Sequence, residues 1–141
     1  MYASMGDFEK AIYYFQKATE LKPNYADAYH NLRNTYIEIR EYEKAIDSLN
    51  KAIEYNPYLW QSHNLLAMAY LNQENYEKSE EHIRESVRIN PANPESLINL
   101  AIILYKKGDV KQSNDILSLV VKEYPENIQA RNLLLQIQAN K

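Results

Sequence analysis

Prolines at a fixed interval constrain the fold of this chain more than any other feature. Each of them follows the previous one by 34 residues, and they are Pro23, Pro57, Pro91 and Pro125. A fixed period of this length is the signature of a solenoid, in which each unit stacks on its neighbour. The segments between the prolines repeat in the same phase: residues 40–46 and 74–80 read REYEKAI and ENYEKSE. The sequence therefore predicts a repeat protein.

Within each period, apolar residues recur at intervals of three and four, the spacing of one face of a helix. In the first complete period, Leu32 and Tyr36 share one such face, and Ala45 and Leu49 share another. We expect these faces to belong to two antiparallel helices, which small residues such as Ala45 and Ser79 allow to approach closely. The proline ends the second helix, because it lacks an amide donor and clashes inside a helix. A single hairpin cannot bury its apolar face, so the hairpins must stack.

This pattern resembles the tetratricopeptide repeat, whose unit is a 34-residue helix–turn–helix ending in proline. In residues 26–59 the marker positions hold Tyr29, Leu32, Tyr36, Ala45, Leu49, Ala52 and Pro57. Residues 60–93 and 94–127 have comparable residues at the same places. The resemblance covers the whole chain. It implies an all-α fold, a right-handed α-solenoid of stacked antiparallel helix hairpins.

We expect residues 1–141 to form a single domain of this kind. Its parts are a partial repeat (1–25), three full repeats (26–59, 60–93 and 94–127) and a C-terminal capping helix (128–141). The expected helices are Phe8–Leu21, Ala26–Ile39, Tyr42–Tyr55, Trp60–Gln73, Tyr76–Ile89, Pro94–Lys107, Val110–Glu123 and Ile128–Ala139.

Two departures from the repeat pattern affect single contacts. Arg33 stands where the family prefers a small residue, which Ala67 keeps. We expect its stem to cross the partner helix and its guanidinium to reach solvent or an acid. Arg40 and Glu74 replace the turn glycine that Gly108 keeps. If their backbone is left-handed, a side chain there costs about 1 kcal/mol.

Composition excludes several classes of function. The net charge is −3, and 16 basic residues are interspersed with 19 acidic ones, so we expect no nucleic-acid partner. Apolar runs such as residues 100–105 are too short to span a bilayer, and no signal-peptide pattern is visible. We therefore expect no membrane insertion and a cytoplasmic protein. The chain has no cysteine, which excludes disulfides and thiolate metal sites.

The sequence contains no catalytic motif. Phosphate-binding glycine loops, nucleophile elbows and His-Glu-x-x-His zinc helices are all missing. We therefore expect no enzyme activity, no cofactor and no metal. His30 lies in the first full repeat, and His63 and His82 lie on different helices of the second: we expect His63 to pack between helices, His82 to lie on an exposed face and His30 to point into a groove.

The groove implied by the resemblance is the remaining candidate site, because the first helices of this family line its concave surface. Inward positions there include Asp27, Gln61, Asn72 and Glu95. The candidate binding residues are His30, Asn31, Asn34, Asn64, Leu65, Met68, Asn99, Ile102 and Asn132. Asparagine recurs among them, and its amide can both donate to and accept from a peptide backbone. The alternative is that asparagine is simply common in this sequence.

The leading hypothesis is a non-catalytic protein–protein interaction module that binds a partner peptide or helix in this concave groove. One alternative is a self-assembling structural scaffold, since Phe8 and Phe15 at the N-terminal end would favour a homo-oligomer through that end. Another is the tetratricopeptide fragment of a larger enzyme such as a glycosyltransferase. Asn31 and Asn99 fall where transferases of the O-linked N-acetylglucosamine type have an asparagine ladder, but Leu65 interrupts it.

One use of the family is argued against by the residues themselves. Domains that clamp the acidic C-terminal tails of chaperones place lysine, arginine and asparagine at set inward positions. Here those positions hold His30, Asn34, Leu65, Glu95 and Asn99. The cations that would meet a carboxylate are missing, so we do not expect a clamp of this type.

Overall fold

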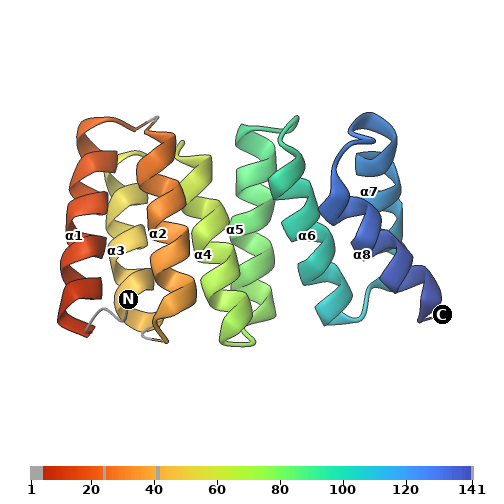
Figure 1. Ribbon diagram of the computed structural model, residues 1–141, viewed down its shortest axis with the longest axis horizontal. Coiled ribbons are helices and arrows are strands. Elements are labelled where there is room, and N and C mark those ends of the chain that lie inside the picture. Colours follow the sequence, from red (N-terminus) through yellow and green to blue (C-terminus); the bar gives the residue numbers. More distant parts are fainter. Residues whose placement is uncertain (1–4, 24, 41, 141) are drawn as a thin grey trace.

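The computed structural model describes the chain except for residues 1–4, 24, 41 and 141. The described residues form eight α-helices and no strand (Figure 1). The helices are α1 (Met5–Leu21), α2 (Ala26–Glu38), α3 (Tyr42–Tyr55), α4 (Trp60–Asn72), α5 (Tyr76–Ile89), α6 (Pro94–Lys107), α7 (Val110–Glu123) and α8 (Ile128–Ala139).

These bounds follow the sequence prediction closely. α1 begins at Met5 instead of Phe8, and α2 and α4 each end one residue early. The other five helices begin and end at the predicted residues. The first four residues of the predicted partial repeat lie outside the described part of the chain. None of the described helices is long and apolar enough to cross a membrane.

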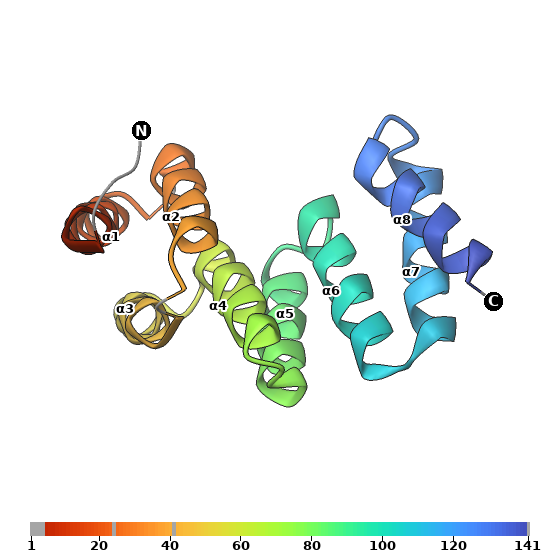
Figure 2. The same cartoon turned by 60° about the horizontal axis from the view of Figure 1, so that its bottom comes forward.

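The helices form one row that begins at α1 and ends at α7 and α8, with α3 between α1 and α2 in the views shown, so the two ends of the described chain lie at opposite ends of the molecule (Figures 1 and 2). From α3 onward each helix packs mainly against the next one in the sequence, whereas α1 packs against both α2 and α3. The apolar core therefore runs along the stack as adjoining clusters: one across α1 to α4, one around α4, α5 and α6, and one across α6, α7 and α8. This confirms the predicted all-α solenoid.

Two hairpins, α4 with α5 and α6 with α7, are the most closely packed pairs of helices. A serine lies at each crossing. Ser79 Oγ donates a hydrogen bond to the backbone oxygen of Ala67 at 2.6 Å, and Ser113 Oγ donates to that of Ala101 at 2.7 Å. All four residues are fully buried. Because both partners are small, the helix axes can come close enough for these side-chain to backbone bonds.

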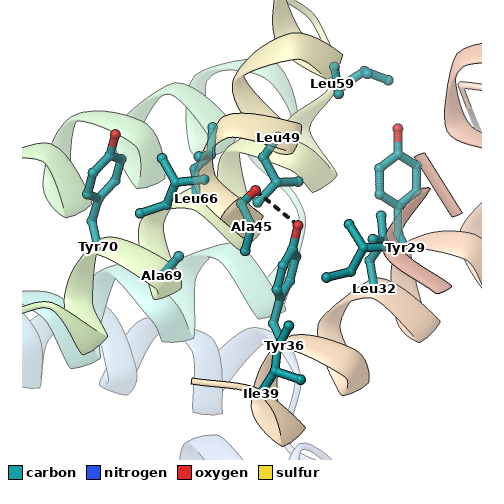
Figure 3. Close-up of a cluster of buried hydrophobic side chains, with 13 residues drawn as sticks. Tyr29, Leu32, Tyr36, Ile39, Ala45, Leu49, Leu59, Leu66, Ala69 and Tyr70 are labelled. Carbon is teal, nitrogen blue, oxygen red and sulfur yellow. Dashed lines mark hydrogen bonds between the residues drawn. The ribbon is translucent and has the colours of Figure 1, made fainter. Parts of the chain in front are cut away.

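The first hairpin is built differently. Among the described residues, α2 and α3 approach each other much less closely than the later pairs. Their contact relies on Tyr36, which reaches from α2 and donates a hydrogen bond from Oη to the backbone oxygen of Ala45 at 3.0 Å (Figure 3). The guanidinium of Arg33 reaches an acid, as expected, and this acid is Glu95 on α6 and not a residue of α3. Where the later hairpins have Ala67 and Ala101 in contact with a serine, α2 has the much larger Arg33, which accounts for the wider spacing.

The last helix, α8, packs against α7 and buries Ala130 and Ile137. Its polar residues Arg131, Gln136 and Gln138 are exposed, in agreement with the sequence pattern. The assignment of α8 as a capping helix stays a prediction.

Candidate functional site

A cavity of about 570 Å³ opens between α2, α4 and α6, the first helices of three successive hairpins. Its lining comes entirely from these helices. The lining residues are Ala26, Asp27, Tyr29, His30, Arg33, Tyr36, Trp60, Gln61, Asn64, Leu65, Met68, Ala69, Asn72, Glu95 and Asn99. The cavity thus faces the side of the stack that the resemblance assigns to the groove.

The 34-residue period places equivalent side chains side by side along the cavity. Asp27, Gln61 and Glu95 are separated by one period each and all line it, near the N-terminal ends of their helices. Glu95 is held there by the helix start: Pro94 is the first helical residue, and the Asn93 side chain accepts a hydrogen bond from the Glu95 amide at 2.9 Å.

Two asparagine side chains lie deep in the cavity. Asn64 on α4 and Asn99 on α6 are each only 5% exposed, and Asn99 Nδ2 donates a long hydrogen bond of 3.5 Å to Asn64 Oδ1. Neither side chain makes another hydrogen bond within the described part of the chain. Each amide can donate and accept more than once, so Asn64 Nδ2 and Asn99 Oδ1 remain available to a ligand.

An apolar wall faces these amides. Tyr36 and Ala69 are buried, whereas Trp60, Leu65 and Met68 are half-buried and leave part of their surface toward the cavity. Aromatic and apolar surface of this kind supplies most of the binding energy in ligand sites, while a few polar groups fix the orientation. The cavity has both components.

An ion pair joins the two outer helices of the cavity. Arg33 Nη1 on α2 lies 2.9 Å from Glu95 Oε1 on α6, so the contact passes across α4. Both side chains are more than 40% exposed, and such pairs contribute about 0–1 kcal/mol to stability. The ion pair therefore affects which ligands can enter the cavity more than it affects the stability of the fold.

The structure brings together five of the nine predicted site residues: His30, Asn64, Leu65, Met68 and Asn99 all line the cavity. The remaining four lie elsewhere. Asn31 and Asn34 are exposed on α2 outside the lining, and Asn34 Nδ2 lies 3.1 Å from His30 Nε2. Ile102 lines a second cavity, and Asn132 is exposed and lines neither.

Sequence reasoning missed several lining residues. The sequence placed Tyr29 and Tyr36 among the marker residues of the repeat and Arg33 at a crossing of helices. The structure shows that all three also line the cavity. The sequence contained one signal that this part of α2 differs from the other repeats: Arg33 replaces the small residue that the family prefers.

The second cavity, of about 450 Å³, lies where α6, α7 and α8 meet. Ile102 and Tyr105 of α6 and Leu133 and Gln136 of α8 contribute to its lining. It lies further along the same stack, toward the C-terminal end, and neither of the buried asparagines lines it.

Two histidines meet between α4 and α5. His63 is buried, as expected, but the expectation of an exposed His82 is wrong, because this ring is half-buried. The Nδ1 atoms of the two rings are 3.1 Å apart, and His82 stacks on Tyr70. The second helix of the hairpin turns His82 toward α4 instead of solvent. No group of three or more histidine, cysteine, aspartate or glutamate side chains suited to a metal ion occurs among the described residues.

The outer face of α1 exposes aromatic surface. Tyr13 and Tyr14 are 58% and 67% exposed and contact each other edge to face. Phe8 and Phe15 are half-buried against the first core cluster. Self-association through this end stays a prediction.

Comparison with known families gives a consistent result. Two family models, both described as Tetratricopeptide repeat, match the sequence, one over residues 2–58 and 70–137 and the other over residues 48–81. The first match covers most of the chain. The search of curated proteins gives no match.

Solved structures share the fold at low sequence identity. TTC0263, a thermophilic tetratricopeptide protein of Thermus thermophilus, is 18% identical with a TM-score of 0.75, over 96% of this chain and 75% of that one. MamA is 18% identical with a TM-score of 0.73, over 99% of this chain and 86% of that one. The second tetratricopeptide domain of human RPAP3 was solved with the HSP70 peptide SGPTIEEVD. It is 20% identical with a TM-score of 0.68, over 78% of this chain and 92% of that one. With the family match and this shared fold, the chain belongs to the tetratricopeptide repeat family.

Proposed function

We propose that this chain is a protein-interaction module that binds a peptide or helical segment of a partner in the cavity between α2, α4 and α6. The observation that carries the proposal is the combination of an apolar wall with two buried amides, Asn64 and Asn99, that have unused hydrogen-bonding capacity. A volume of about 570 Å³ is within the usual range of ligand sites.

The two amides suit a peptide backbone. A peptide group presents one N–H and one C=O, and Asn99 Oδ1 and Asn64 Nδ2 offer one acceptor and one donor. Both side chains are only 5% exposed, so a bond from either amide to a ligand would replace little hydration on the protein side. Backbone recognition of this kind tolerates different side chains in the partner.

The apolar wall would supply the affinity. Trp60, Leu65 and Met68 keep part of their surface uncovered, and a side chain of the ligand would remove that surface from water. The RPAP3 domain, which shares this fold, was solved with a bound peptide, and this supports a peptide as the class of ligand.

The test compares two pairs of asparagines. Peptides selected from a random displayed library on the unmodified chain serve as the probe. Replacing Asn64 and Asn99 together by alanine is expected to weaken their binding about tenfold or more, because two hydrogen bonds are lost. Fluorescence anisotropy with the synthetic peptides measures the change.

The matched control replaces Asn31 and Asn132 together by alanine. Both are exposed asparagines on first helices outside the cavity lining, so binding should not change. Circular dichroism must show the same helicity for both double variants. If the Asn64 and Asn99 variant is folded and binds as tightly as the control, the proposed function is wrong.

A further inference from the structure

The charges around the cavity are unequal. Its lining contains two carboxylates, Asp27 and Glu95, and one guanidinium, Arg33, but no lysine. Because Asp27, Gln61 and Glu95 follow one another at the repeat period, the carboxylates form one rim with an amide between them. Each carboxylate carries a full negative charge, which is larger than the roughly half unit of positive charge at the N-terminal end of its helix.

The guanidinium is already engaged. Arg33 Nη1 binds Glu95 Oε1 at 2.9 Å, which leaves Asp27 as the lining carboxylate with no ion pair among the described residues. An acidic ligand would meet Asp27 and would have to separate Arg33 from Glu95 to reach a cation. A basic ligand could bind Asp27 directly, or replace Arg33 at Glu95, without leaving a carboxylate unpaired.

The apolar surface lies within reach of this rim. Trp60 begins α4 next to Gln61, and Leu65 and Met68 follow one and two turns further along the same helix. A ligand side chain resting on these residues would therefore have its neighbours close to the acidic rim. Apolar burial and charge complementarity would then select adjacent residues of one short segment.

We propose that the cavity selects a basic peptide segment in which a large apolar side chain stands next to lysine or arginine. This inference rests on the proposed function and adds the chemistry of the ligand. The apolar side chain lies on Trp60, Leu65 and Met68, the backbone bonds to Asn64 and Asn99, and the cation faces Asp27 and Glu95. The charge of the rim, and not the volume of the cavity, decides between ligands.

The experiment begins with a random displayed peptide library selected on the unmodified chain. Peptides that lose binding on the Asn64→Ala, Asn99→Ala variant are kept as ligands of the cavity and are sequenced. Their affinities are then measured on Glu95→Gln and on Arg33→Gln. The first variant frees Arg33 and should weaken basic peptides about threefold or more, whereas the second frees Glu95 and should strengthen them.

Two further variants control for net charge. Asp47→Asn on α3 and Asp115→Asn on α7 each remove one exposed carboxylate that does not line the cavity, and should leave affinity unchanged. The four charge variants alter exposed or half-exposed side chains, so folding should persist, whereas Asn64 and Asn99 are buried; thermal midpoints and circular dichroism check the fold of every variant.

The outcomes separate the two proposals. Cavity ligands rich in lysine or arginine beside a large apolar residue, with opposite responses to Glu95→Gln and Arg33→Gln, support the inference. Cavity ligands that are acidic, or that respond equally to all charge variants, overturn it but leave the proposed function standing. If no selected peptide depends on Asn64 and Asn99, the proposed function fails and the inference fails with it.

Discussion

Two buried tyrosines of α2 differ in whether their hydroxyl groups make a hydrogen bond. Tyr36 Oη donates to the Ala45 backbone oxygen at 3.0 Å. Tyr29 Oη is buried and has no hydrogen-bond partner among the described residues, although the hydroxyls of Ser62 and Thr19 lie near enough to affect its ionisation. Burial raises the pKa of both phenols, so both are neutral in the folded protein.

We predict that Tyr36→Phe lowers the free energy of unfolding by about 1 kcal/mol, because it removes the hydrogen bond between α2 and α3. Tyr29→Phe is the matched control on the same helix and should change stability much less. Urea denaturation followed by circular dichroism measures both. Equal losses for the two variants would show that the Tyr36 hydrogen bond does not hold the first hairpin.

The histidine pair gives the hairpin of α4 and α5 a dependence on pH. His63 Nε2 lies 3.1 Å from the Pro57 carbonyl oxygen, which can only accept, so in the neutral ring Nε2 carries the proton and Nδ1 accepts from His82 Nδ1. Burial, followed by the nearby His63, lowers the pKa of His82, and Lys78 lowers it further. The carboxylates of Glu81 and Glu85 oppose this change.

The folded state therefore favours the neutral form of His82, and its pKa is lower than in the unfolded chain. We predict full stability above the ordinary histidine pKa of about 6.5, and a loss as pH falls from there through the lowered value. Thermal midpoints measured across this range provide the test. His82→Asn should flatten the profile; an unchanged profile in this variant would rule out His82 as the origin.

At the scale of elements, the turns between helices follow two patterns. Glu74 has φ 60° and Gly108 has φ 99°, and the amides that follow them bond to Tyr70 and Leu104 in the same way. Glu74 thus adopts the left-handed conformation that glycine favours. Arg40, at the equivalent place after α2, is not among the described residues with a positive φ, and Ile39 before it is extended.

We predict that Glu74→Gly raises the free energy of unfolding by up to about 1 kcal/mol, since it relieves the left-handed side chain. Arg40→Gly should instead lower stability, because it only adds freedom to the unfolded chain. Chemical denaturation of the two variants distinguishes them. A gain for Arg40→Gly equal to that for Glu74→Gly would contradict the difference in backbone conformation.

The helices themselves were predictable because their signals are local. Periodic apolar residues and regularly placed prolines mark each start and end, and the structure departs from them mainly at α1, α2 and α4. The spacing of α2 and α3 was not predictable in the same way. The sequence shows Arg33 in place of a small residue, but nothing local identifies its partner, Glu95, which is 62 residues away.

At the scale of the whole molecule, repeat phase predicted which helices line the groove but not its extent. His30, Asn64 and Asn99 were found from their positions within the unit. Asn31 and Ile102 occupy inward positions as well, yet one is exposed and the other lines the second cavity. The main cavity is lined by α2, α4 and the start of α6, and no single position in the sequence encodes this extent.

The central claim is that one face of this solenoid, formed by α2, α4 and α6, binds a peptide. Nuclear magnetic resonance of the isotope-labelled chain, titrated with a selected peptide, tests it most directly. The account predicts that shifted signals gather on these three helices and include the side-chain amides of Asn64 and Asn99. Shifts confined to α3, α5 and α7, or to Tyr13 and Tyr14 of α1, with both amides unchanged, would contradict it.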